Sequence, residues 1–297
     1  MSRKAQMDAF GAVALVLVAA LLGYNQVVIK QVNEGFQPVF FAGLRSAGVV
    51  VCLWLWMRFR GIALDLKTAR LWGIAAGIVF SIEFTLLFLA LDLSSVSRVT
   101  VIFNSMPVWL AIGSHYLLPG ERLHFWKAVG LILAMAGVVV AMFERGFDFE
   151  NGSFIGDICA LGAAFGWAGI TLMMRATPLQ TLRPETQLFW QVLGSAVLLL
   201  LISPLFGPLM RDFQMVHLWG VAFQIVIVVT GVFLFWFWLL TIYPASAVAS
   251  FGFLAPVFGV MFGWLILGES LGFGIVFALV LVAIGVYLIN RPPKLRD

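Results

Sequence analysis

The chain has 297 residues, of which 62% are hydrophobic and 11% are charged, and its formal net charge is +4. This composition, with a mean hydropathy of +1.05, excludes an ordinary soluble globular protein and indicates a membrane protein with many spans. The apolar runs are continuous, whereas the strands of a membrane β-barrel alternate in hydrophobicity, so the spans are predicted to be helices.

Ten apolar segments follow one another, and a bilayer core of about 30 Å needs about 20 helical residues for each crossing. We predict helices at 8–30, 37–57, 70–91, 96–118, 124–143, 154–175, 185–206, 216–240, 245–267 and 271–290. The first is too long, and too polar toward its end, to be a cleaved signal peptide. Cys52 and Cys159 lie within apolar segments and are interpreted as small buried side chains, so no disulfide, metal site or cofactor is expected.

Lysine and arginine are distributed unevenly between the two predicted sides, which sets the orientation of a membrane protein. With the amino terminus inside, thirteen of the 18 basic residues lie at inner segments and Arg45 lies inside a helix. The four at outer segments are Lys30, Arg98, Arg145 and Arg211. Both termini are therefore predicted to be cytoplasmic. The same bias explains the net positive charge, so no nucleic-acid partner is inferred.

The two halves of the chain end in matching patterns. Pro107 precedes an apolar stretch, Gly-Glu at 120–121 and a second apolar stretch, and Pro256 precedes the same arrangement around Gly-Glu at 268–269. Gly137 and Gly285 stand at the same offset after the two Gly-Glu pairs. We predict an all-α polytopic membrane protein with ten transmembrane helices in two five-helix repeats, 1–146 and 147–297. Five is an odd number, so the repeats must be inverted, as in many secondary transporters.

Polar residues within the predicted spans of the first repeat lie at one depth, roughly 6 to 13 Å from the outer boundary. They are Asn25, Arg45, Glu83 and Asn104. A charged side chain at mid-membrane costs about 2.5–3.5 kcal/mol, so Arg45 and Glu83 are expected to avoid lipid, and pairing them would satisfy both. One interpretation of such a pair is a structural link between two helices, and the other is a gate or a site for the two charges of an amino acid. As a further alternative, Arg45 extends its side chain to the membrane surface.

In the second repeat the inversion predicts a corresponding layer nearer the cytoplasm, and its polar and aromatic candidates are Trp167, Thr171, Gln187, Trp190, Gln191, Trp236 and Ser250. Several of them recur at spacings of three or four residues and so share helix faces. They are interpreted as the wall of a cavity, with an interfacial aromatic belt or simple packing as the alternative.

Two further features are interpreted structurally. Pro107 and Pro256 lie inside predicted helices, where a missing backbone donor can bend the helix, either statically or for alternating access. Glu121 and Glu269 lie in tight turns and are expected to accept hydrogen bonds from free backbone amides there.

The sequence gives little support for an enzyme. The three histidines lie at predicted helix ends, and the chain has no HExxH or CxxC motif and no phosphate-binding loop that would allow ATP to drive transport. A membrane-embedded transferase and a channel-like pore remain as alternatives to a carrier, but the polar residues form two separate layers and not a continuous path.

The chain resembles ten-helix members of the drug/metabolite transporter superfamily with paired EamA-type repeats. The resemblance covers nearly the whole chain and rests on the two Pro...Gly-Glu helix pairs, the first-helix stretch ending in Lys30, Arg45, and Trp167-Ala168. Many members carry Trp-Gly near the end of the first helix, where this chain has Leu22-Gly23, so a role of that tryptophan is not transferred.

Within the superfamily the chain is most similar to the bacterial aromatic amino-acid exporters. The resemblance implies a protein of the bacterial cytoplasmic membrane that exports small organic solutes, such as amino acids, by alternating access, with other metabolites or drugs as the alternative. Its central cavity would hold substrate through Trp167, Thr171, Gln187, Trp190, Gln191, Asn25 and Asn104. Glu83 and Arg45 would serve gating or proton coupling, and Pro107 and Pro256 would allow helix bending.

Overall fold

A computed structural model of the chain describes residues 8–118, 123, 125–143, 153–232, 235, 238–239, 242–243, 251 and 254–290. Over these residues it is helical, apart from connecting segments and one isolated antiparallel bridge between Phe36 and Met210. The elements are α1 (Ala9–Gly35), α2 (Pro38–Phe59), α3 (Arg70–Leu93), α4 (Val96–Phe103), α5 (Met106–Leu117), α6 (Phe125–Phe143), α7 (Ser153–Ala176), η1 (Pro178–Thr181), α8 (Pro184–Ile202), η2 (Ser203–Phe206), α9 (Met215–Ala222), η3 (Phe223–Val232), α12 (Leu254–Leu267) and α13 (Phe273–Asn290).

These elements form the predicted membrane helices. Eight helical segments of the described chain are long and apolar enough to cross a bilayer, counting α4 with α5, α8 with η2 and α9 with η3 as one segment each. The shorter apolar helices α12 and α13 account for the last two predicted spans. The prediction of an all-helical polytopic membrane protein is therefore confirmed.

Three spans differ from regular predicted helices. The span at 96–118 is divided at Asn104 and Ser105, because Pro107 in the first turn of α5 has no amide hydrogen for the preceding turn. The span at 216–240 passes from α9 into the π-helix η3. The first span continues to Gly35, five residues beyond its predicted end at residue 30. Pro256 is buried at the third position of α12.

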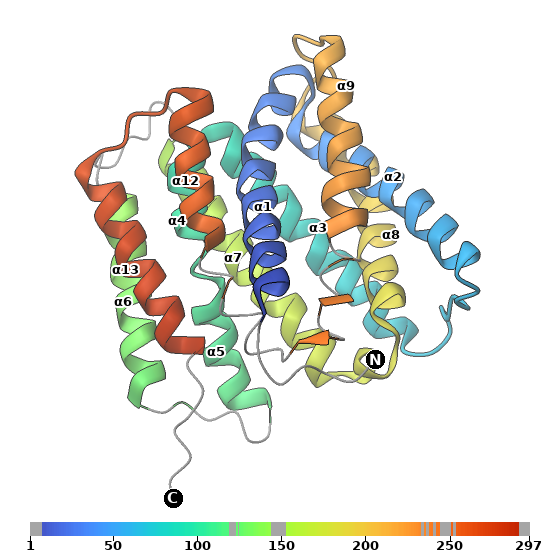
Figure 1. The fold of residues 1–297 in the computed structure, drawn as a ribbon. Helices are drawn as coiled ribbons and strands as arrows, with labels where there is room; N and C mark the ends of the chain where they lie inside the picture. The colour runs from blue at the N-terminus through green and yellow to red at the C-terminus, as the bar shows by residue number, and fades with distance from the viewer. Residues whose placement is uncertain are drawn as a thin grey trace, which may run out of the picture.

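The packing of the helices reproduces the inverted repeat. When the ten spans are numbered in chain order, spans 1 to 5 of the first repeat correspond to spans 6 to 10 of the second. A contact between spans 1 and 9 then requires the equivalent contact between spans 6 and 4. The structure has both, since α1 packs on α12 and α7 packs on α5. The self-equivalent pairs α2 with α8 and α6 with α13 also pack together, and α6 and α13 lie side by side in Figure 1. The bundle thus has an approximate two-fold relation between its halves.

Close approach of α6 and α13 depends on small residues at equivalent positions. A Cβ on Gly137 would lie 2.7 Å from the Ala278 carbonyl oxygen, and one on Gly130 would lie 2.6 Å from the Gly285 oxygen. Gly137 corresponds to Gly285 in the repeat, and Gly130 corresponds to Ala278, so the two contacts are counterparts. Small residues at helix crossings are the usual means of packing membrane helices closely.

Helix α1 begins, and α13 ends, at the same end of the bundle, which is the lower end in Figure 1. We refer to it as the inner end, following the orientation predicted from charge, and to the opposite end as the outer end.

Candidate functional site

Arg45 lies at the centre of a polar cluster between the repeats. Its side chain is buried in α2 at 3% exposure, and the guanidinium carbon lies 4.0 Å from the centre of the Phe84 ring and 4.9 Å from that of Phe88. Both rings belong to α3, so the cation is held by cation–π contacts. Its Nη1 also donates a hydrogen bond to Gln224 Oε1 at 3.4 Å.

The expected pairing of Arg45 with Glu83 is wrong as a direct contact. No ion pair joins them, although their charges interact at longer range. The reason is the helical rotation of α3, which presents Phe84 and Phe88 to Arg45 and turns Glu83 toward α7. There a Cβ on Gly166 would lie 2.9 Å from the Glu83 Cβ, so this glycine makes room for Glu83.

Glu83 is fully buried, and neither of its carboxylate oxygens has a hydrogen-bond partner among the described residues. Arg45 Nε likewise has no described acceptor. Buried polar atoms are nearly always satisfied, and exceptions often mark functional sites or places for water and ligands. The centre of the bundle therefore holds a donor and an acceptor of opposite charge that are free to bind other groups.

Gln224, which was not among the residues predicted from sequence, links this cluster to α1. Its Nε2 donates to the Asn25 backbone oxygen at 3.2 Å and also to Asn25 Oδ1. Gln224 is fully buried at the second position of η3. As an amide within an apolar segment it could have been noticed from sequence, but the π-helix, a feature often found at functional sites, could not.

A second polar contact lies on the other side of α1, at the break between α4 and α5. Thr100 Oγ1 donates to Gln26 Oε1 at 2.7 Å, and Asn104 Nδ2 donates to the Thr100 carbonyl oxygen at 2.7 Å. Asn104 therefore ends α4 beside the irregular backbone that Pro107 causes. Asn25 and Gln26, which are adjacent on α1, connect the two polar groups.

Trp167 of α7 lies next to this break. Its ring meets that of Phe103, the last residue of α4, edge to face, with centroids 6.2 Å apart. Trp167 is only partly buried, and Thr171, one turn later, donates its hydroxyl to the Trp167 carbonyl at 3.0 Å. The structure thus places Trp167 against Phe103, the residue before Asn104, while the Thr171 hydroxyl is bound within its own helix.

The other candidates of the second repeat lie in packed surroundings. Gln187 Nε2 donates to the carbonyl oxygens of Leu179 and Leu182, and Gln191 Nε2 donates to the Gln187 carbonyl at 3.3 Å. Trp190 is buried against α3, where a Cβ on Gly73 would lie 2.4 Å from its ring. These contacts fit helix packing. Trp236 and Ser250 lie outside the described residues.

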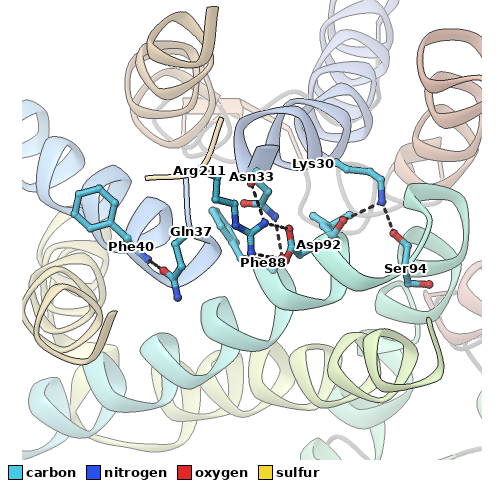
Figure 2. A network of polar contacts seen from close by, with 9 residues as sticks. Lys30, Asn33, Gln37, Phe40, Phe88, Asp92, Ser94 and Arg211 are labelled. Carbon is cyan, nitrogen blue, oxygen red and sulfur yellow. Dashed lines mark hydrogen bonds and ion pairs between the residues drawn. The ribbon is translucent and has the colours of Figure 1, made fainter. Parts of the chain in front are cut away.

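Charged contacts join the repeats at the outer end. Arg211, from the segment before α9, donates to both carboxylate oxygens of Asp92 at 2.7 and 2.9 Å, and to the Asn33 carbonyl at 3.0 Å (Figure 2). Within the first repeat, Lys30 donates to the carbonyl oxygens of Leu91 and Ser94 at the end of α3 (Figure 2). These contacts explain why α1 continues past Lys30.

Beside them lies a buried ion pair. Arg98 of α4 and Asp157 of α7 are 2% and 0% exposed, and they pair through two guanidinium nitrogens. Ser94 Oγ donates to the same carboxylate at 2.8 Å. Arg98 was counted from sequence as an outer segment residue, but its partner, 59 positions away, draws it into the bundle.

The sequence pattern of the EamA-like transporter family matches the chain twice, over residues 9–143 and 154–291. The chain belongs to this family. The two matches fall on the two halves whose packing shows the inverted repeat, so the EamA-like family assignment and the fold agree.

Relatives of this EamA-like transporter are similar over nearly their whole length. A probable amino-acid metabolite efflux pump of Escherichia coli is 29% identical, over 94% of this chain and 93% of its own. An uncharacterised transporter of Bacillus subtilis, YoaV, is 22% identical, over 92% and 94%. One solved crystal structure superimposes with a TM-score of 0.67 at 20% identity, covering 95% of this chain and 98% of its own, which supports the fold.

Proposed function

We propose that the protein is a secondary transporter of the bacterial cytoplasmic membrane that exports small organic solutes, amino acids and aromatic ones among them, by alternating access. The observation that carries this proposal is the buried Arg45 guanidinium, which has a free donor and no carboxylate in contact among the described residues. A guanidinium in low-dielectric surroundings is a natural partner for a substrate carboxylate. The name of the Escherichia coli relative supports amino acids as the substrate class.

The surroundings of Arg45 fit an amino acid. Glu83 offers an unpartnered carboxyl for the ammonium group, and the amides of Asn25 and Asn104 offer neutral polar contacts on two sides of α1. Phe103 and Trp167 provide an aromatic wall at the break between α4 and α5. We keep these residues as the proposed substrate contacts and assign packing roles to Trp190, Gln187 and the Thr171 hydroxyl.

Alternating access would exchange the packing of the two inverted repeats. The contacts of Arg211 with Asp92 and of Arg98 with Asp157 join the repeats at the outer end in this structure. Release of substrate to the outside would require this end to loosen. The break beside Pro107 and the π-helix η3 provide irregular backbone at which the spans could bend.

The deciding experiment is efflux of labelled amino acids from loaded cells, comparing the wild type with Arg45→Lys. Lysine keeps the charge but lacks the planar fork of donors, so we expect efflux of amino acids to fall by about tenfold or more, the cost of one charged hydrogen bond. Arg58→Lys, the same change at an exposed position of α2, is the matched control and is expected to be neutral.

Two results would contradict the proposal. Normal efflux in Arg45→Lys cells would remove Arg45 from the binding site, and no efflux of any amino acid by the wild type would shift the substrate class to other metabolites or drugs. A counterflow assay distinguishes a carrier from a pore. In a carrier, unlabelled substrate on one side of the membrane accelerates the movement of labelled substrate from the other side, whereas in a pore it does not.

A further inference from the structure

A cavity of about 390 Å³ lies between α1 and α9 at the outer end of the bundle. The two helices are neighbours at the top of Figure 1. The cavity is lined by polar side chains toward its mouth, among them Gln31, Glu34, Asp212 and Gln214, and by the aromatic rings of Tyr24 and Phe223 at its deep end. Its volume is within the range of sites for small molecules.

The charges at the mouth of the cavity are acidic. Glu34 and Asp212 are both exposed there, whereas the neighbouring cations are engaged elsewhere. Lys30 donates to carbonyl oxygens at the end of α3, and Arg211 pairs with Asp92. The two carboxylates therefore give the cavity a negative field that attracts an ammonium group.

His217 adds a buried donor to the same cavity. It is 6% exposed and lines the cavity, and its Nδ1 accepts a hydrogen bond from the Gln214 amide at 3.0 Å. Because Nδ1 is the acceptor, the neutral ring carries its hydrogen on Nε2, and no described residue accepts from that atom. A donor and two carboxylates in one cavity match the two ends of a zwitterion.

The deep end of the cavity adjoins the Arg45 cluster. Tyr24 and Phe223 meet edge to face with ring centroids 5.6 Å apart, and the next residues along the chain are Asn25 and Gln224. One aromatic contact thus separates the outer cavity from the central polar groups.

We propose that this cavity is an outer vestibule that binds a free amino acid as its zwitterion after it passes the Tyr24–Phe223 contact; this inference rests on the proposed function and names the site from which the substrate leaves. Glu34 and Asp212 hold the ammonium group, and His217 Nε2 donates to the carboxylate. The aromatic rings of Tyr24 and Phe223 face the substrate side chain.

Protection of a thiol at the cavity tests the site directly. Val216 lines the cavity and is 62% exposed, so Val216→Cys, in a protein with Cys52→Ala and Cys159→Ala, is open to a membrane-impermeant maleimide. The protein is placed in nanodiscs of phosphatidylcholine and phosphatidylglycerol, and labelling is followed with phenylalanine, phenylethylamine or 3-phenylpropionate. We expect phenylalanine to slow labelling most, the amine less and the acid least.

Neutralising the acids should weaken this protection. Glu34→Gln with Asp212→Asn is expected to raise the phenylalanine concentration for half-protection about tenfold, the effect of two ion pairs of ordinary surface strength. The matched control removes one Glu and one Asp at the inner end, Glu185→Gln with Asp65→Asn, and should leave protection unchanged. Equal protection in both double variants, or equal protection by all three compounds, would overturn the proposal.

An ammonium group can also come from a lipid. Labelling is therefore also measured without any soluble compound, in nanodiscs with and without phosphatidylethanolamine. If labelling is slow with this lipid and fast without it, the cavity binds a lipid headgroup and the vestibule proposal is overturned. Protection by phenylalanine in a protein that shows no efflux of amino acids would retain the cavity site and reject the proposed function. Efflux of amino acids without protection of the thiol would retain the proposed function and reject the cavity site.

Discussion

The carboxylate of Glu269 caps the amino end of α4 at Ser97, which lies 172 positions earlier in the chain. Glu269 Oε2 accepts from the Ser97 amide at 2.9 Å and from its hydroxyl at 2.7 Å, and Oε1 accepts from the Val96 amide. The first amides of a helix have no partners within it and favour a negative charge. Glu269 does accept from free amides, as expected, but these amides belong to α4 of the other repeat, so the prediction that it closes its own helix hairpin is wrong. Glu121 lies outside the described residues.

This cap predicts a stability change. Glu269→Gln removes the charge and one acceptor, so we expect the free energy of unfolding to fall by about 1–2 kcal/mol, as for loss of a helix cap. SDS-induced unfolding in mixed micelles measures it. Glu185→Gln, at the first turn of α8, is the control and should cost no more than about 0.5 kcal/mol. Equal values for the two variants would contradict the cap.

The buried pair of Arg98 and Asp157 should contribute far more than the exposed pair of Arg211 and Asp92. Asp157→Asn leaves a buried cation without its counter-charge and is expected to cost about 3–5 kcal/mol, whereas Asp92→Asn, beside an arginine that is 40% exposed, should cost about 1 kcal/mol or less. Adding Arg98→Gln to Asp157→Asn should recover part of the loss. If the double variant is less stable than Asp157→Asn alone, the pair is not what fixes α4 to α7.

The sequence predicts the membrane class, the ten spans and the repeat, because these depend on local hydrophobicity and on the matching of the two halves. It predicts distant side-chain partners poorly. Arg45 and Glu83 are complementary in charge and predicted depth, but α3 turns by about 100° per residue, so Phe84 and not Glu83 faces Arg45. Gln224 carries no charge and was overlooked, although it connects Arg45 to Asn25.

Trp167 is the aromatic residue whose removal should affect transport most selectively. It is partly exposed and meets Phe103 at the broken span, so Trp167→Ala should lower transport severalfold with little loss of folded protein, and Trp167→Phe should be milder. Trp264→Ala, at a tryptophan that is 52% exposed on α12, is the control. Transport rates normalised to folded protein measure the effect. A similar loss in both tryptophan variants would point to a general packing defect.

The predicted topology can be tested apart from transport. Tags at Met1 and Asp297 should both be cytoplasmic, and a cysteine reporter near Phe147 should be labelled from outside, as the distribution of lysine and arginine requires. Accessibility to impermeant reagents in intact and opened cells measures this. Termini on opposite sides of the membrane would contradict the assignment of the inner and outer ends of the bundle.

Glu83 provides the sharpest test of coupling. A structural strut would require a partner, but both of its carboxylate oxygens are without one among the described residues, so Glu83→Gln should change the free energy of unfolding by less than about 1 kcal/mol. An intramembrane acid that takes up and releases a proton is a natural coupling group. We therefore expect Glu83→Gln to abolish accumulation driven by a pH gradient, while counterflow exchange continues at higher substrate concentrations because the amide oxygen still accepts a hydrogen bond from the substrate ammonium group. Glu269→Gln, which removes a carboxylate at the outer end, is the control and should keep its response to the gradient. A Glu83→Gln protein that unfolds easily, and that regains stability when Arg45→Gln is added, would instead show that the two charges act as a strut over a distance.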